Sequence, residues 1–142
     1  MKPRIFIFED EYLIRFSLTA KLTKRGFDVR SFSDPTFCPA ISKPDLTCPN
    51  SDRDTCCDFL LTDIKMPNLT GLEFIEKQQE KGCNVVFGNK AVMSAAWSDE
   101  DLIKAERLGC KIFHKPLDFE AVFGWLEEEL GLLAVDRQPV PS

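Results

Sequence analysis

The sequence predicts an α/β fold in which helices cover both faces of a parallel, five-stranded sheet. Short apolar runs that suit strands alternate five times with helical patterns, and one of the expected helices is missing. These runs lack the polar alternation of a strand with one face in water, which indicates a sheet covered on both sides. The 142 residues, of which 44% are hydrophobic, provide enough apolar material for the core of one domain.

The first third of the chain predicts a strand, a helix and a second strand. Residues 4–8 are mostly Ile and Phe, as in a short strand that is covered on both faces. Apolar residues at four-residue spacing predict the helix that follows, which Gly26 ends. The buried stripe of this helix is Ile14, Leu18 and Leu22. Residues 28–32 predict the second strand, with Val29 as its clearest buried member.

The segment from Ser33 to Thr55 interrupts this alternation. Prolines at positions 35, 39, 44 and 49 leave no interval that is long enough for an ordinary helix. We therefore expect an irregular loop, rich in Pro and Cys, in place of most of the second helix. A loop of this length is uncommon in a compact domain unless a link stabilises it or it has a function.

The rest of the chain predicts three more strands, each followed by a helix. The strands are residues 59–63, 91–93 and 111–113. The helices are expected to begin near Gly71, Ser98 and Asp118, since Ser and Asp are favoured N-cap residues. With the last helix ending near Leu130, we place one domain at residues 1–131 and a short flexible tail at residues 132–142.

Five side chains with related chemistry follow the predicted strands at their carboxyl ends, where open parallel sheets bind ligands. They are Glu9, Asp10, Asp63, Ser94 and Lys115. Carboxylates that converge with water make a hard oxygen site that suits Mg²⁺, and an ammonium group binds phosphoryl oxygens. A carboxylate can also be the nucleophile in phosphoryl transfer. This edge therefore predicts phosphoryl chemistry.

Four motifs at these strand ends together resemble the receiver domain of two-component response regulators. They are Phe8-Glu9-Asp10-Glu11, the run from Leu60 through Thr62-Asp63-Ile64-Lys65-Met66-Pro67 to Gly71, Met93-Ser94-Ala95, and His114-Lys115-Pro116. The resemblance extends to about Leu130. It implies a flavodoxin-like (βα)5 fold with the strand order 2-1-3-4-5.

The resemblance also implies a role for each residue at this edge. Asp63 would accept a phosphoryl group from a histidine kinase or a phosphotransfer protein, and Ser94 and Lys115 would contact that group. The Mg²⁺ ligands would be Glu9, Asp10, Asp63 and the Lys65 carbonyl. The Lys115–Pro116 bond is expected to be cis. The chain would be a signalling phosphoacceptor rather than an enzyme, with self-catalysed transfer and slow autodephosphorylation.

The sequence departs from the family pattern at several positions. Glu9 stands where aspartate is commoner, so it is expected to reach the metal through water. Ile112 stands where many receivers carry an aromatic side chain that swings inward on phosphorylation, so the switch is expected to be muted or replaced. No output domain follows Leu130, and we expect a stand-alone receiver that signals to a downstream protein through residues 99–108 and 112–130. It would be a monomer or a phosphorylation-dependent dimer.

The cysteines leave two interpretations open. Cys38, Cys48, Cys56 and Cys57 bracket the proline-rich loop, and a zinc ion or a disulfide there would give the loop the link that it lacks. Their spacing is not that of common zinc sites, and the adjacent pair also fits small buried residues that enter a strand. In a reducing cytoplasm we expect metal before disulfide.

Composition and sign of charge exclude several other functions. The net charge of −5 argues against a nucleic-acid partner, and no stretch is long enough to span a membrane. We expect a cytoplasmic protein. An electron carrier that binds a flavin phosphate would not place three acids after its first strand. A haloacid-dehalogenase-type phosphatase needs a second aspartate where Lys65 stands. The remaining alternative is a pseudo-receiver, or a metal- or redox-responsive docking module that uses the Cys-rich loop.

Overall fold

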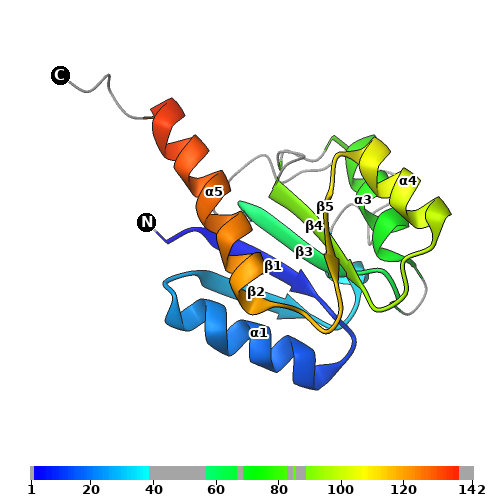
Figure 1. Ribbon diagram of the computed structural model, residues 1–142, viewed down its shortest axis with the longest axis horizontal. Helices are drawn as coiled ribbons and strands as arrows, with labels where there is room; N and C mark the ends of the chain where they lie inside the picture. Colours follow the sequence, from blue (N-terminus) through cyan, green and yellow to red (C-terminus); the bar gives the residue numbers. More distant parts are fainter. Residues whose placement is uncertain (1, 39–56, 67–68, 83–84, 86–88, 138–142) are drawn as a thin grey trace.

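The computed structural model describes residues 2–38, 57–66, 69–82, 85 and 89–137 (Figure 1). It contains one sheet of five strands, all of which pair in parallel in the order β2-β1-β3-β4-β5. The strands are β1 (Arg4–Phe8), β2 (Asp28–Phe32), β3 (Phe59–Asp63), β4 (Lys90–Ser94) and β5 (Lys111–His114). The predicted fold class and strand order are confirmed.

Four α-helices cover the two faces of this sheet (Figure 1). They are α1 (Tyr12–Lys24), α3 (Gly71–Glu80), α4 (Asp99–Leu108) and α5 (Phe119–Arg137), and a short 3-10 helix, η1, spans Pro35–Phe37. α1 and α5 pack on one face, around Leu22 and Trp125, and α3 and α4 pack on the other, around Phe74 and Ala105. The central strands β3 and β4 are buried along their whole length, as their apolar runs predicted.

Local signals in the sequence set most helix ends. Ser98 caps α4 by accepting a hydrogen bond from the Asp101 N–H, and the Asp118 side chain accepts one from the Glu120 N–H at the start of α5. Gly26 and Gly109 follow α1 and α4 with φ angles of 98° and 75°. Such left-handed residues are where helices commonly stop, so these predicted ends are confirmed.

Three expectations about the elements need correction or qualification. α5 does not end near Leu130 but continues to Arg137, since Gly131 costs a helix only about 1 kcal/mol and the next proline is Pro139. Val29 is half-buried rather than buried, because β2 is an edge strand. The proline-rich loop forms η1 after β2, and residues 39–56, where most of it falls, lie outside the described residues.

Within the part of the chain that the structure describes, none of the helices is both long and apolar enough to cross a lipid bilayer.

Candidate functional site

Backbone hydrogen bonds just beyond the strand ends hold the site residues in the sheet. The N–H of Glu9 donates to the Phe32 carbonyl at 3.0 Å, which continues the pairing of β1 with β2. The N–H of Lys115 donates to the Ser94 carbonyl at 2.9 Å, which continues the pairing of β4 with β5. The side chains that follow β1 and β5 are thereby fixed at the carboxyl edge of the sheet, as the sequence predicted.

The turn after β3 fixes Asp63 at the same edge. The N–H of Ile64 donates to the Met93 carbonyl at 3.0 Å, and the N–H of Gly71 donates back to the Ile64 carbonyl at 2.9 Å. A Cβ atom at position 71 would collide with the carbonyl oxygen of Asp63. Only glycine allows α3 to begin this close to the end of β3.

The side chains of three acids and one lysine converge at this edge. Carboxylate oxygens of Glu9, Asp10 and Asp63 all lie within 4.8 Å of one another. The Lys115 ammonium lies 3.0 Å from Glu9 Oε2 and 3.2 Å from Asp63 Oδ2. Glu9 is completely buried and Asp63 nearly so, whereas Asp10 is exposed. The cluster is therefore open to solvent on the side of Asp10. The Lys115–Pro116 bond next to the cluster is cis, as expected.

Burial and the shared lysine shift the proton affinities of this cluster. Burial raises the pKa of Glu9 to about 7, although the hydrogen bond from Lys115 opposes the rise. Burial also raises the pKa of Asp63, again against Lys115. Burial would lower the pKa of Lys115, but the hydrogen bond and charge of Glu9 and the charge of Asp63 outweigh it and raise that pKa. The lysine stays charged between two carboxyl groups that compete for it.

The remaining predicted residues lie near the cluster without joining it by a direct side-chain contact. The Ser94 hydroxyl is buried at the end of β4, where it accepts a hydrogen bond from the Ala96 N–H at 3.1 Å. The backbone N–H of Lys65 donates to Asp63 Oδ1 at 3.4 Å. His114, the single histidine of the chain, is exposed at the end of β5.

The cysteines predicted to flank the loop are described only in part. Cys38 and Cys57 are half-buried and pack against the core on the side of α3 and α4, while Cys48 and Cys56 lie outside the described residues. The group Glu9, Asp10 and Asp63 is the single one among the described residues that is suited to a metal ion. A zinc site or disulfide at the loop has no support from the structure and stays a prediction.

Sequence reasoning missed two contacts next to the site. Arg15, on the first turns of α1, donates from Nη1 to the Glu9 carbonyl at 2.6 Å and so ties α1 to the end of β1. Trp97, three residues after Ser94, donates from its indole N–H to the Phe113 carbonyl at 2.9 Å. These contacts join residues 6 and 16 positions apart, which match no helix or strand repeat, so no spacing rule reveals them.

A family model for the response regulator receiver domain matches residues 5–126. The chain belongs to the receiver domain family of two-component response regulators. The match overlaps every strand of the sheet and reaches into the first half of α5, and it includes all the acids and the lysine of the cluster. Receiver domains are signalling phosphoacceptors, and this receiver carries the charged residues that its family resemblance implied.

Two curated proteins are similar in sequence to this receiver. Sporulation initiation phosphotransferase F of Bacillus subtilis (strain 168) is 26% identical over 134 residues, which cover 93% of this chain and 97% of that protein. A protein-glutamate methylesterase/protein-glutamine glutaminase of Anaeromyxobacter dehalogenans (strain 2CP-C) is also 26% identical, over 122 residues. The match covers 80% of this chain and 32% of the methylesterase, so the chain spans about a third of that relative.

Solved structures show the same fold. The N-terminal domain of an uncharacterized protein from Wolinella succinogenes has a TM-score of 0.77 at 24% identity, and covers 95% of this chain and 99% of its own. A CheY-like receiver domain from Methanospirillum hungatei JF-1 has a TM-score of 0.76 at 19% identity, with 96% and 99% covered.

Proposed function

We propose that this receiver accepts a phosphoryl group on Asp63 from a phosphohistidine of a histidine kinase or phosphotransfer protein. The convergence of three carboxylates and Lys115 at one edge of the sheet is the observation that carries this proposal. Asp63 is the member of the group that both contacts the lysine and stands at the end of the central strand β3. The cluster is open to solvent on the side of Asp10, where a donor can approach.

The transfer is a displacement at phosphorus. A carboxylate oxygen of Asp63 forms a bond to phosphorus while the bond between phosphorus and the donor's imidazole nitrogen breaks. The imidazole leaves with the electron pair of that bond and takes up a proton from water. Lys115, 3.2 Å from Asp63, neutralises charge on the phosphoryl oxygens, and the Ser94 hydroxyl donates a hydrogen bond to one of them. Hydrolysis of the acyl phosphate by water slowly returns Asp63 to its carboxylate.

The donor set fits Mg²⁺. Three carboxylates with oxygens within 4.8 Å of one another, one of them exposed, are hard ligands that leave room for water. Glu9, Asp10, Asp63 and the Lys65 carbonyl would hold the ion. When bound, it supplies positive charge for the phosphoryl oxygens. Because Glu9 Oε1 already accepts the Glu11 N–H at 3.1 Å and Oε2 accepts Lys115, we place Glu9 at the ion through a water molecule.

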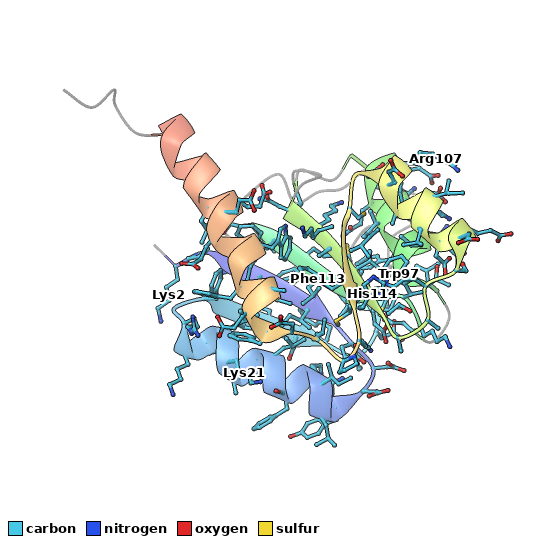
Figure 2. The ribbon with its side chains drawn as sticks, in the orientation of Figure 1. Lys2, Lys21, Trp97, Arg107, Phe113 and His114 are labelled. Carbon is cyan, nitrogen blue, oxygen red and sulfur yellow. The ribbon has the colours of Figure 1, made fainter. Side chains whose placement is uncertain are left out.

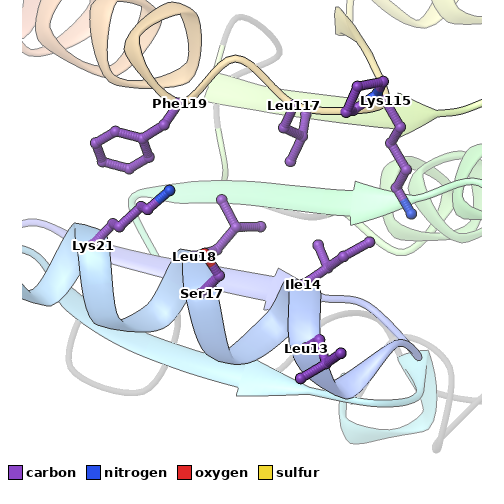
Figure 3. Close-up of a pocket in the computed structure, with 9 residues that line it drawn as sticks. Leu13, Ile14, Ser17, Leu18, Lys21, Lys115, Leu117 and Phe119 are labelled. Atoms are coloured by element: carbon purple, nitrogen blue, oxygen red, sulfur yellow. The ribbon is translucent and has the colours of Figure 1, made fainter.

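The surface beside the cluster supports α1 as the docking site of the donor. A groove of about 270 Å³ runs between α1 and the segment after β5, with Leu13 and Leu18 on one wall and Leu117 on the other (Figure 3). The Lys115 side chain lies at one end of it. On the outer side of α1, Tyr12, Leu13 and Phe16 expose between 59% and 79% of their surface. Exposed apolar side chains in such a group mark interaction sites.

We further propose that the phosphorylated receiver signals to a downstream protein through the surface of α4, β5 and α5. A receiver acts by changing the population of surfaces that a partner meets. A cytoplasmic location is proposed with it, because histidine kinases phosphorylate their receivers there.

Phosphorylation with a small donor tests the site directly. With acetyl phosphate and Mg²⁺, intact-mass measurement should show one added phosphoryl group per chain, and none in Asp63→Asn. The matched control is Glu128→Gln, which removes an exposed acid on α5 and should be phosphorylated like the unaltered chain. A full phosphoryl load on Asp63→Asn would show that another side chain is the acceptor. The absence of any product in the unaltered chain would favour the pseudo-receiver.

A further inference from the structure

Trp97 links the candidate site to β5. Its indole N–H donates to the Phe113 carbonyl at 2.9 Å, and its ring meets the exposed His114 ring edge to face, with ring centroids 6.4 Å apart (Figure 2). The indole therefore joins the turn after β4 to the last two residues of β5. The link joins β4, which ends at Ser94 in the candidate site, to β5, which belongs to the proposed signalling surface.

The connection from the site to Trp97 is short and consists of contacts in series. The Ser94 hydroxyl accepts the Ala96 N–H at 3.1 Å, so its hydrogen remains available to a phosphoryl oxygen. If the hydroxyl moves toward a phosphoryl group on Asp63, it draws the Ala96 backbone with it. Trp97 is the next residue, and the one hydrogen bond of its indole N–H cannot stay at the same length when its backbone moves away from β5.

Trp97 also lies on the same side of the sheet as Ile112, the residue that stands where many receivers carry an aromatic side chain. Neighbouring residues on β5 point to opposite faces, with Phe113 in the core beside α1 and α5 and Ile112 on the side of α3 and α4. Trp97 packs on that second side together with Ile112, Leu108 and Cys110. The turn after β4 thus places an aromatic ring beside β5.

We propose that Trp97 carries the phosphorylation state of Asp63 to the signalling surface. In the unphosphorylated chain the indole is bound to the Phe113 carbonyl and lies against His114. Phosphorylation releases this hydrogen bond, moves the ring away from β5 and His114, and exposes Ile112 to a partner. The inference rests on the proposed function, because it needs a phosphoryl group or its analogue at Asp63.

The test follows the indole N–H signals of the full ¹⁵N-labelled chain while beryllofluoride and Mg²⁺ are added. The chain has two tryptophans, so Trp97→Phe and Trp125→Phe assign the two signals. Bound beryllofluoride is detected separately by its ¹⁹F signal. We expect the Trp97 signal to move upfield and its exchange with water to become about fivefold faster, the protection that one ordinary hydrogen bond provides. The Trp125 signal, from a side chain in the core, should not move.

The outcomes separate this inference from the function on which it rests. A bound ¹⁹F signal with an unchanged Trp97 signal would overturn the role of Trp97 and leave the phosphoacceptor function standing. The absence of a bound ¹⁹F signal would remove both. As a second readout, Trp97→Phe should still bind beryllofluoride but lose the accompanying amide shifts of Ile112 and His114, whereas Trp125→Phe should keep them. Full amide shifts on β5 in Trp97→Phe would also overturn the inference.

Discussion

Glu9 differs chemically from the acids around it because its carboxyl group is completely buried. It has two partners, the Lys115 ammonium at 3.0 Å and the Glu11 N–H at 3.1 Å, yet burial still outweighs them and raises its pKa to about 7. A buried carboxylate without full compensation costs stability when it ionises. Without a metal ion, the ionised Glu9 carboxylate therefore lowers the stability of the folded chain.

The first prediction concerns Glu9→Gln. In the unfolded chain the Glu9 carboxyl has its ordinary pKa of 4.5, and in the folded chain about 7, so the folded state binds the proton more tightly. The Glu9 carboxyl group accordingly makes the unaltered protein less stable as pH rises from 4.5 to 7, and the glutamine variant lacks this contribution. Without Mg²⁺, Glu9→Gln should be more stable by up to about 3 kcal/mol above pH 7 and nearly equal at pH 4.5. Urea unfolding at a series of pH values measures this.

The control for this prediction is Glu11→Gln, which removes an exposed acid two residues away. Its unfolding free energy should stay parallel to that of the unaltered protein at every pH. The account is contradicted if the difference in unfolding free energy between Glu9→Gln and the unaltered protein is the same at every pH. It is also contradicted if the variant loses stability relative to the unaltered protein as the pH rises. In either case burial does not raise the pKa of Glu9.

At the scale of elements, the connection from β3 to α3 decides where Asp63 stands. The Gly71 N–H donates to the Ile64 carbonyl, and the Thr70 hydroxyl caps α3 by accepting the Glu73 N–H at 3.1 Å. The Thr70 N–H in turn donates to Glu73 Oε1 at 3.3 Å, which completes a capping box. The helix thus begins immediately behind the acid, and there is no space for a side chain between them.

Gly71→Ala should therefore be destabilising, by about 1–3 kcal/mol, since its Cβ would collide with the Asp63 carbonyl oxygen and crowd the Thr62 methyl group. It should also slow phosphorylation by acetyl phosphate, because the turn that holds Asp63 must shift. Gly124→Ala is the matched control: a Cβ there meets nothing within 4 Å, so alanine in this helix should stabilise by about 0.5–1 kcal/mol. Equal stability changes for the two variants in urea unfolding would contradict the steric account.

The elements that the sequence predicted well are those with local causes. Gly26, Ser98 and Gly109 set helix ends through their own backbone or side chain, so each is visible in a few residues. The end of α5 was predicted wrongly because Gly131 weakens a helix without stopping it, and the following residues keep the helix to Arg137. The burial of Val29 depended on the strand order, which no local pattern contains.

The candidate site shows the same division at the scale of the whole molecule. Parallel strand ends meet at one edge, so the sequence alone predicted that Glu9, Asp63 and Lys115 come together. That Lys115 contacts both acids, and that Glu9 is the more buried of them, depends on packing across 106 residues of chain. The hydrogen bond of Trp97 was missed because it also depends on tertiary packing. The outward apolar residues of α1 were missed because the buried stripe of a helix does not predict the function of its opposite face.

The two faces of α1 have different partners. Its inner face packs Leu18 and Leu22 into the core, while Tyr12, Leu13 and Phe16 face outward beside the groove that ends at Lys115 (Figure 3). A group of large apolar side chains on the surface indicates an interaction site, where a partner covers them. Because this group lies beside the groove that ends at Lys115, and α4 packs on the opposite face of the sheet, the proposed docking site of the donor is separate from the α4 part of the proposed signalling surface.

This separation predicts that Leu13→Ala and Phe16→Ala affect phosphorylation by a protein donor but not by a small one. Truncating a side chain at the centre of an interface commonly weakens binding about tenfold, so kcat/KM for transfer from a phosphorylated histidine kinase or phosphotransfer protein should fall by that factor. The rate with acetyl phosphate should stay unchanged, because a small donor needs no docking surface. Ile103→Ala is the control, since Ile103 is similarly exposed, at 58%, but lies on α4. Equal losses for Leu13→Ala and Ile103→Ala with the protein donor would contradict docking on α1, and a loss with acetyl phosphate would mean that the α1 variants disturb the site itself.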